Sequence, residues 1–284
     1  MMQDRLDLAA LTEFIVDFIT DAQRHAGKTF ICGLSGAQGA GKSTLAEKLA
    51  ARLSQDGLTC LILALDDFYL SKAARLALSK HVHPLCATRG VPGTHYVARL
   101  KDTLSALKTG APVHLPRFDK TSDDVAADED VMHSAPDIIV LEGWCVGATA
   151  TMLAAAPETE WEKAHDPQAI WTGWSRQAAQ DYEPVWAACD MLVQLRQSDF
   201  DEVIDARWLQ EQGNAARSGR WQFKDRAAVA DFCAHYESWT KALWRDLPSH
   251  ADIVIDRAAD FTYRPHLSPV NSTVDLPANS TIKA

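Results

Sequence analysis

The sequence predicts an α/β fold in which a parallel β-sheet is covered by helices on both faces. Short apolar segments without alternation recur along the chain, and stretches with helical periodicity separate them, which is the pattern of buried parallel strands. One of these segments runs directly into a Gly-rich turn that opens a helix. The 284 residues are expected to form a single domain over 1–284, with a helical insertion over about 145–181 and an irregular tail over about 263–284.

The expected elements follow in chain order. A helix is expected over 4–25, where Leu11, Ile15 and Phe18 recur at helical spacing. A strand over 28–35 leads into the Gly-rich turn, and a helix over 42–53 follows it. Further strands are expected at 58–65, 137–141, 191–195 and 251–255. Further helices are expected at 97–107, 174–188, 200–212 and 227–247.

Three segments interrupt this alternation. Residues 145–181 are rich in Ala, Glu and Trp, and we interpret them as a helical insertion or a long connection. Residues 121–134 carry many acids and few apolar side chains, which favours a mobile surface loop. From Tyr263 onward the chain is rich in Pro, Ser and Asn without a period, which predicts an irregular tail.

The composition argues against several classes of protein. The 38 acidic and 28 basic side chains give a formal net charge of -10, whereas proteins that bind nucleic acid or anionic membranes need a basic face. An anionic small molecule is still compatible with this charge, because a pocket can be locally positive. The six cysteines have no zinc or redox spacing, and neither a signal peptide nor a membrane span is recognisable. We therefore expect a cytoplasmic protein without nucleic-acid or membrane partners.

The strongest motif is Gly36–Ser43, a complete GxxxxGK[ST] pattern between a strand and a helix. Its glycines allow backbone N–H groups to curl around a phosphate, and the helix N-terminus adds a positive dipole. In such a loop Lys42 reaches the β- and γ-phosphates and the Ser43 hydroxyl binds Mg²⁺. The alternative is a Gly-rich turn that binds nothing, but the strand–loop–helix context favours a P-loop NTPase fold. The residues expected to bind ATP are Gly36, Ala37, Gln38, Gly39, Ala40, Gly41, Lys42, Ser43 and Thr44.

Three acids come at the ends of two predicted strands. Asp66 and Asp67 end one strand, and Glu142 ends another. Ligands of open α/β sheets bind at the carboxyl ends of the strands, so one acid can hold Mg²⁺ and another can accept the proton of an attacking hydroxyl. The alternative is that these acids only cap helices or face water. Their position near the P-loop favours a functional role, with Ser43, Glu142 and Asp67 as the expected metal site.

These motifs resemble a known family. The runs GLSGAQGAGKST and LDDFYL resemble the P-loop kinases that include uridine kinase, pantothenate kinase and phosphoribulokinase. Three further runs, TRGVPGTH, LPRFDK and VLEGW, are similar to the D-glycerate 3-kinase family, as are the runs YEPVW and RWLQEQ. The resemblance spans about residues 29–256 and leaves out both ends of the chain.

The resemblance implies roles for individual residues. Asp66 matches the general base of the related uridine kinases, so Asp66 and Lys42 are the expected catalytic residues, and Glu142 matches the acid near Mg²⁺. ATP and Mg²⁺ are the implied cofactors, and an anionic small molecule is the implied acceptor. The positions expected to bind the acceptor are Arg89, His95, Arg117, Asp119 and Lys120.

Two arginines are candidates for holding a carboxylate of the acceptor. Arg89 and Arg117 are suited to this because a guanidinium binds a carboxylate through two parallel hydrogen bonds. Each of them could instead form an ordinary surface ion pair. The family pattern places Asp after the Gly-Thr-His run, whereas this chain has Tyr96, a departure that bears on which acceptor is bound.

Arginines beyond the fourth predicted strand suggest a lid. In related kinases a basic helix–loop element closes over the phosphates, and here the helix over 200–212 and a polar loop over 213–219 lie in the corresponding place. An Arg there neutralises charge on the transferring phosphoryl group, and the alternative is a solvated helix face. The expected lid residues are Arg207, Arg217 and Arg220.

The leading interpretation is an ATP-dependent kinase that phosphorylates a hydroxyl of an organic acid, with D-glycerate as the acceptor that the resemblance favours. A nucleoside, pantothenate or sugar kinase of the same fold is the alternative among enzymes. A regulatory module that binds ATP without a phosphoryl acceptor is the alternative from another class. The Asp66–Asp67 pair favours the enzyme, because a regulatory module needs no acceptor base.

Overall fold

A six-stranded sheet forms the centre of the computed structural model, which describes residues 5–267. The strand order is β10-β9-β8-β1-β7-β2, and every neighbouring pair is parallel except β9 with β10. The strands are β1 (Phe30–Gly36), β2 (Cys60–Ala64), β7 (Ile138–Gly143), β8 (Met191–Arg196), β9 (Ile253–Arg257) and β10 (Tyr263–Leu267). The expected parallel strands are all present, and the α/β fold is confirmed.

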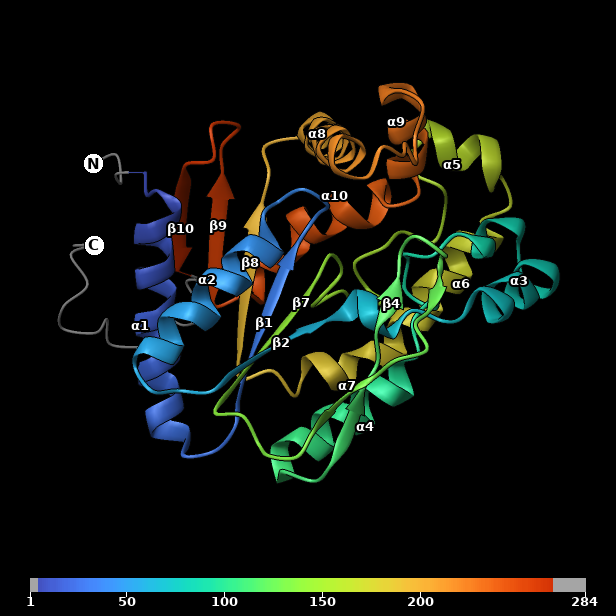
Figure 1. The fold of residues 1–284 in the computed structure, drawn as a ribbon. Coiled ribbons are helices and arrows are strands. Elements are labelled where there is room, and N and C mark those ends of the chain that lie inside the picture. Colours follow the sequence, from blue (N-terminus) through green and yellow to red (C-terminus); the bar gives the residue numbers. More distant parts are fainter. Residues whose placement is uncertain (1–4, 268–284) are drawn as a thin grey trace.

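Helices cover both faces of this sheet (Figure 1). The buried side chains of β1 alternate between the faces, because successive side chains of a strand point in opposite directions. Phe30, Cys32 and Leu34 pack with α1 (Leu8–Ala26) and α2 (Lys42–Gln55). Ile31 packs in the opposite core. That core is shared with α4 (Val97–Thr109), the 3-10 helix η3 (Ala179–Tyr182), α7 (Glu183–Trp186) and α10 (Glu237–Asp246).

The carboxyl ends of the parallel strands meet at one edge of the sheet, where the phosphate-binding loop lies. The loop follows β1 and ends at Gly41, which precedes α2. Gly39 and Gly41 have φ angles of 71° and 96°, a left-handed conformation that favours glycine. At the same edge the 3-10 helix η1 (Leu65–Phe68) follows β2.

The helices after β8 differ from the expected ones. α8 (Phe200–Ser218) continues through Gly213, so the polar loop expected over 213–219 is wrong. The helix expected over 227–247 is divided into α9 (Arg226–Ala234) and α10. Likewise, residues 174–188 form three short pieces, α6 (Ile170–Ala178), η3 and α7. Pro184 begins the last of these at a position where its missing N–H costs nothing.

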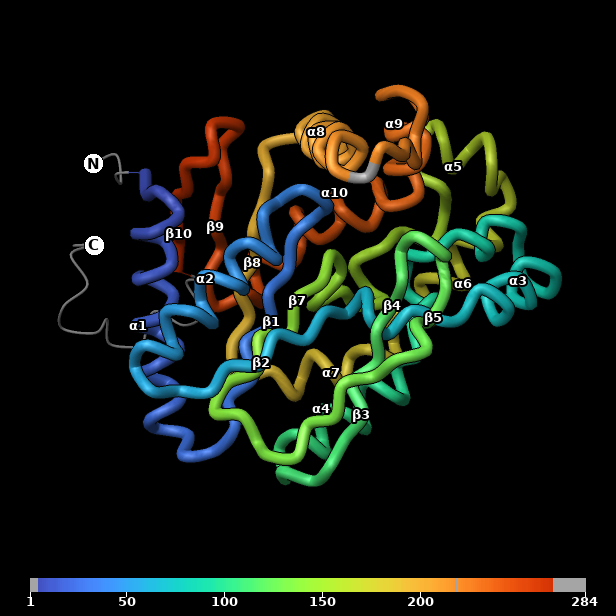
Figure 2. Tube along the Cα trace, viewed as in Figure 1, coloured from blue at the N-terminus to red at the C-terminus, as the bar shows by residue number. Residues whose placement is uncertain are grey.

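Two parts of the acid-rich segment 121–134, which was expected to be a mobile surface loop, are paired as short strands. β4 (Phe118–Asp119) pairs with β5 (Asp124–Val125), and β3 (Val113–Leu115) pairs with β6 (Asp130–Met132). Figure 2 shows β3, β4 and β5 along one continuous green part of the trace. Sequence reasoning also missed α3 (Lys72–His81) and the 3-10 helix η2 (Pro84–Ala87), whereas α5 (Glu160–His165) falls within the helical insertion expected over 145–181.

The segment that begins at Tyr263 is a strand over its first five residues. β10 pairs with β9 as an antiparallel edge strand, and the N–H of Tyr263 donates to the carbonyl of Leu6 at 2.9 Å. The irregular tail expected from residue 263 is therefore wrong for 263–267, and the rest of it lies outside the described residues. Within the described part of the chain, no helix is long and apolar enough to cross a membrane.

Candidate active site

The phosphate-binding loop brings two predicted residues into contact with a neighbouring strand. The Ser43 hydroxyl donates to Oε1 of Glu142 at 2.8 Å. The contact follows from the sheet, since β1 pairs with β7 and Leu34 lies opposite Glu142 in their register. Lys42 folds back over the loop, and its Nζ donates to the carbonyl of Ala37 at 3.1 Å.

Lys42 also lies within the electrostatic field of two acids. Burial lowers the pKa of its ammonium, while the charges of Glu142 and Asp66 oppose that shift. The charge of Lys120 lowers the pKa further. The structure therefore places Lys42, Asp66 and Glu142 around one point at the carboxyl ends of β1, β2 and β7.

Asp66 forms an ion pair with Lys120. Lys120 Nζ lies 2.7 Å from Oδ2 of Asp66. Burial raises the pKa of Asp66, but the charge and hydrogen bond of Lys120 lower it, and the charges of His95 and Lys42 lower it further. The net pKa lies below the ordinary value, so Asp66 is a carboxylate at neutral pH and is able to accept a proton.

Asp67 points to a different set of partners. Its Oδ1 accepts a hydrogen bond from the backbone N–H of Phe118 at 3.1 Å, and its Oδ2 lies 3.6 Å from Arg117. Burial raises its pKa, and these two partners oppose that shift. The expected metal site is thus divided, because Ser43 contacts Glu142 whereas Asp67 fastens the β4 segment to η1.

Oxygen ligands suited to Mg²⁺ are present where Ser43 meets Glu142. Mg²⁺ in such sites keeps several waters and uses one or two carboxylates together with substrate phosphates. The hydroxyl and the carboxylate are hydrogen-bonded at the start of α2, and they fit this ion without a third side-chain acid. Within the described residues, no group of three or more His, Cys, Asp or Glu is arranged to hold a metal.

Arg89 is held in place on three sides. Its Nη1 donates to Oδ1 of Asp123, and its guanidinium lies over the ring of Phe118 at 5.4 Å from the centroid. The hydroxyl of Tyr236 donates to its backbone carbonyl at 2.7 Å. The Arg89 side chain is only 13% exposed.

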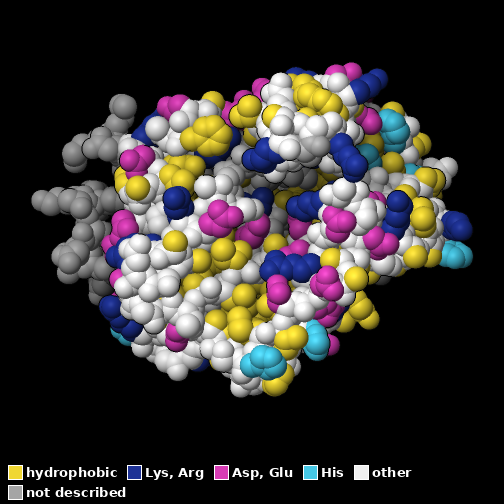
Figure 3. Space-filling model, viewed as in Figure 1, with side chains coloured by type: hydrophobic (Ala, Val, Ile, Leu, Met, Phe, Trp, Pro, Cys, Tyr) yellow, Lys and Arg dark blue, Asp and Glu magenta, His cyan; other side chains and the backbone are white. Residues whose placement is uncertain are grey.

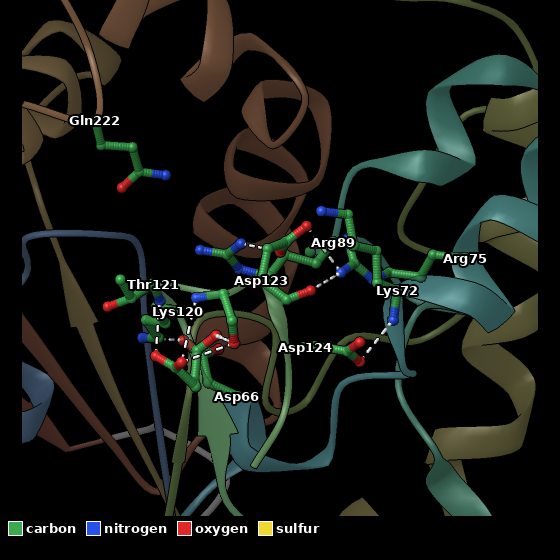
Figure 4. Close-up of polar contacts among 12 residues, drawn as sticks. Asp66, Lys72, Arg75, Arg89, Lys120, Thr121, Asp123, Asp124 and Gln222 are labelled. Carbon is green, nitrogen blue, oxygen red and sulfur yellow. Dashed lines mark hydrogen bonds and ion pairs between the residues drawn. The ribbon is translucent and has the colours of Figure 1, made fainter.

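Arg75 of α3 supports this arrangement from the side, next to Arg89 and Asp123 (Figure 4). It is buried and donates to three backbone carbonyls, those of Leu70, Ala87 and Asp123. It also forms an ion pair with the Asp123 carboxylate at 3.0 Å. Asp123 therefore links two arginines. Charge patterning over 121–134 gave no sign of these two ion pairs.

Of the other residues predicted to bind the acceptor, some lie near Asp66 and some do not. Arg117 is 56% exposed and pairs with Asp130 at 2.8 Å. The Asp119 carboxylate closes its own turn, accepting from the backbone N–H of Thr121 at 2.8 Å and from Ser122. Of the PRFDK run, the structure thus brings Lys120 to Asp66, while Arg117 and Asp119 have other partners.

His95 is buried beside the Asp66 segment. Its ring stacks on Tyr69 with 4.4 Å between centroids, and its Nδ1 lies 2.8 Å from the hydroxyl of Tyr182. Burial lowers its pKa to about 4, although the charge of Asp66 opposes that shift. The ring is therefore neutral at pH 7. Tyr96, the next residue, is 57% exposed.

The predicted lid arginines are not equivalent. α8 packs directly on the phosphate-binding loop, since a Cβ at Gly39 would overlap that of Ala206. Arg207 is 12% exposed, lies 3.5 Å from Glu211 and covers the ring of Phe223. Arg217 is exposed and bonds Asn214 in its own helix, and Arg220 is exposed beyond the end of α8. Figure 3 shows this face of the molecule hollowed below α8, with basic and acidic side chains around the hollow.

Two polar residues that sequence reasoning missed support the loop from behind. Gln197 Nε2 donates to the carbonyl of Gln38 at 3.2 Å, and Arg257 Nη2 donates to that of Gly39 at 3.4 Å. Arg257 is almost fully buried and lies 3.6 Å from Glu202. Both residues come at the carboxyl ends of strands, β8 and β9, which is the signal that identified Asp66 and could have found them.

Comparisons with known proteins relate the chain to nucleotide-binding proteins and kinases. A family model, the methylmalonyl Co-A mutase-associated GTPase MeaB, matches residues 10–70, which include the phosphate-binding loop. The uncharacterized kinase mug58 of Schizosaccharomyces pombe is 30% identical over 244 residues, which cover 81% of this chain and 86% of that protein. The chloroplastic D-glycerate 3-kinase of Arabidopsis thaliana is 26% identical over 78% of this chain, and the match spans 50% of that protein.

Solved structures show the same fold. The YGR205w protein matches with a TM-score of 0.73 and 18% identity, covering 92% of this chain and 99% of that one. A D-glycerate 3-kinase from Cryptococcus neoformans var. grubii matches with a TM-score of 0.72 and 20% identity, covering 90% and 99%. The resemblance to these kinases that the sequence motifs predicted is confirmed.

Proposed function

The chain belongs to the family of P-loop kinases that includes the mug58 kinase of S. pombe, and from this premise we propose that it transfers the γ-phosphoryl group of ATP to a hydroxyl of D-glycerate. The observation that carries the proposal is the meeting of Lys42, Asp66 and Glu142 at the carboxyl ends of three adjacent strands. Similarity to two D-glycerate 3-kinases supports the choice of acceptor.

Each residue of the site has a separate role in the proposed phosphoryl transfer. The acceptor's hydroxyl oxygen attacks the γ-phosphorus, the bond from that phosphorus to the β,γ-bridging oxygen breaks, and the hydroxyl proton passes to Asp66. Lys42 stabilises the charge of the phosphates at the start of α2. Ser43 and Glu142 would hold Mg²⁺, which supplies further neutralisation of the phosphate charge when bound.

Arg89 is the residue that we assign to the acceptor's carboxylate. A guanidinium that is already oriented loses less freedom when it binds a carboxylate, and Arg89 is oriented by Asp123, Phe118 and Tyr236. Arg117 is 56% exposed, against 13% for Arg89, and pairs with Asp130. An exposed ion pair of this kind contributes little to binding, so Arg89 is the better candidate.

Arg207 is the lid residue that we propose to act on the phosphoryl group. It follows Ala206, which packs on Gly39 of the phosphate-binding loop. Its Nη1 is buried, makes no hydrogen bond within the described part of the chain, and lies 3.5 Å from Oε2 of Glu211. Arg217 and Arg220 are exposed, and we assign them to the outer face of the lid.

The experiment that tests this function compares acceptors. We expect D-glycerate to give a kcat/KM more than about tenfold above that of uridine, pantothenate, a hexose, or glycerol, which lacks the carboxylate. Phosphoryl transfer is measured as ADP release with saturating ATP and Mg²⁺. A nucleoside, pantothenate or sugar that exceeds glycerate by tenfold would replace it as the acceptor, and absence of transfer to all of them would favour a regulatory module.

Two arginine variants make the same assay specific for the carboxylate. Arg89→Lys keeps the charge but removes bidentate binding, so it should reduce the preference for glycerate over glycerol by roughly 10–100-fold. Arg117→Lys is the matched variant and should leave that preference unchanged. Loss of the preference in Arg117→Lys alone would reverse the assignment.

A further inference from the structure

Tyr182 and His95 form a buried hydrogen-bonded pair that faces the proposed acceptor site. Both side chains are buried, and His95 Nδ1 lies 2.8 Å from the Tyr182 hydroxyl oxygen. The same oxygen accepts a hydrogen bond from the backbone N–H of Gly93 at 3.0 Å. The backbone N–H groups of Gly93 and His95 both lower the pKa of Tyr182, against the larger effect of burial. Because the oxygen already accepts a backbone N–H, this arrangement favours donation of the hydroxyl proton to Nδ1.

This direction of the hydrogen bond decides the tautomer of His95. When Nδ1 accepts the hydrogen bond of the Tyr182 hydroxyl, the single N–H proton of the neutral ring is on Nε2. Burial keeps the ring neutral, with a pKa of about 4. The pair therefore presents Nε2–H as a donor of fixed orientation.

Nε2 is buried and has no hydrogen-bond partner within the described residues. Buried donors are nearly always paired in native proteins, so an unpaired one points to a partner that arrives with a ligand. The ring cannot turn freely to find another partner, because it stacks on Tyr69 at 4.4 Å and meets Tyr182 edge-on at 88°.

The position of the ring places this donor near the reacting hydroxyl. Tyr69 is bridged to His95 and follows directly on the Asp66–Phe68 turn. The charge of Asp66 also raises the pKa of His95 against the effect of burial, in keeping with this position beside η1. An acceptor whose hydroxyl contacts Asp66 thus has another part of itself within reach of His95.

We propose that Tyr182 is a positioning residue that holds His95 as an obligatory donor, through Nε2–H, to an oxygen of the acceptor next to the phosphorylated hydroxyl. The proposal rests on the proposed function, because the oxygen belongs to that acceptor. It predicts a substrate class, namely compounds with a hydrogen-bond-accepting oxygen adjacent to the reacting hydroxyl. Compounds that lack this oxygen leave Nε2–H unpaired and bind weakly.

The first test uses the unmodified protein. ¹⁵N NMR of ring-labelled histidine distinguishes the two neutral tautomers, and we expect His95 as the Nε2–H form at pH 7. Addition of D-glycerate with a non-hydrolysable ATP analogue should shift the Nε2–H resonance. A protonated ring or the Nδ1–H tautomer would overturn the proposal, and this readout does not depend on any turnover of substrate.

Substitution of Tyr182 gives the functional test. Tyr182→Phe removes the hydroxyl and keeps the ring, so His95 should shift toward the Nδ1–H tautomer and the KM for the acceptor should rise about tenfold. The KM for ATP should be unchanged. The control variant Thr109→Val removes an exposed hydroxyl at the end of α4 and should change neither quantity.

A variant of His95 separates this role from a structural one. The amide N–H of Gln occupies about the place of Nε2–H, so His95→Gln should retain more affinity for the acceptor than His95→Leu. Equal KM values in these two variants, or an unchanged KM in Tyr182→Phe, would contradict the proposal. If the wild type phosphorylates no acceptor, the proposed function fails. The ¹⁵N NMR measurement of the His95 tautomer then still tests whether Tyr182 holds His95 in the Nε2–H form.

Discussion

Asp66→Asn is expected to lower kcat for phosphoryl transfer by roughly 10²–10⁴-fold, because the amide cannot accept the proton of the attacking hydroxyl. The side chain keeps its shape, and its ion-pair partner Lys120 is 60% exposed and can turn to water. Binding of an ATP analogue, measured by calorimetry, should therefore stay close to that of the wild type. The combination of lost turnover with retained nucleotide binding is what assigns Asp66 to the acceptor's proton.

The matched control for this variant is Asp102→Asn, which alters an exposed carboxylate on α4. It should leave both turnover and nucleotide binding unchanged. A rate for Asp66→Asn close to that of the wild type would remove Asp66 from the chemistry. A parallel loss of nucleotide affinity would instead place Asp66 in the binding of ATP and would favour the regulatory module.

Lys42→Ala should lower kcat by about 10²–10³-fold, the usual cost of removing one preorganised donor to developing charge. Lys42 Nζ now donates to the carbonyl of Ala37 and lies close to Glu142 and Asp66. Its removal leaves those two acids facing the phosphates, so the affinity for ATP should fall as well. Turnover and calorimetric Kd for the ATP analogue measure the two effects.

Lys48→Ala provides the comparison for this variant. Lys48 is exposed on α2, the helix that Lys42 begins, and its substitution should affect neither kcat nor the Kd. Equal behaviour of the two lysine variants would contradict the phosphate-binding role of the loop.

The sequence predicted most of the sheet because the central strands are predominantly apolar. β1 is buried along its whole length, and each parallel strand was recognisable from a continuous apolar run. β10 was not predicted as a strand because it is a short edge strand with Pro265 in its middle. Its pairing with β9 depends on residues outside its own segment. Edge strands tolerate proline, so local composition resembles that of a tail.

The candidate site also has a part that local sequence predicts and a part that depends on tertiary packing. Gly36–Ser43 is a local motif, and Glu142 was found from its place at a strand end, so both were accessible to sequence reasoning. The links from Arg75 through Asp123 to Arg89 and from Tyr182 to His95 join residues that are far apart in the chain. No spacing rule predicts such pairs, because only tertiary packing brings them together.

Asp123 shows why charge patterning misled us. It lies in an acid-rich segment, which usually indicates a solvated loop. Two arginines from other parts of the chain bind its carboxylate, and its side chain is 32% exposed; the residue adopts a left-handed conformation with φ of 58°. Its partners, rather than its neighbours in sequence, decide where it lies.

A crystal structure with a non-hydrolysable ATP analogue, Mg²⁺ and D-glycerate would test the central claim most directly. We expect the glycerate carboxylate to bind the guanidinium of Arg89, and one hydroxyl to lie within hydrogen-bond distance of the Asp66 carboxylate and in line with the γ-phosphate. A carboxylate bound at Arg117, or a hydroxyl directed away from Asp66, would contradict the account.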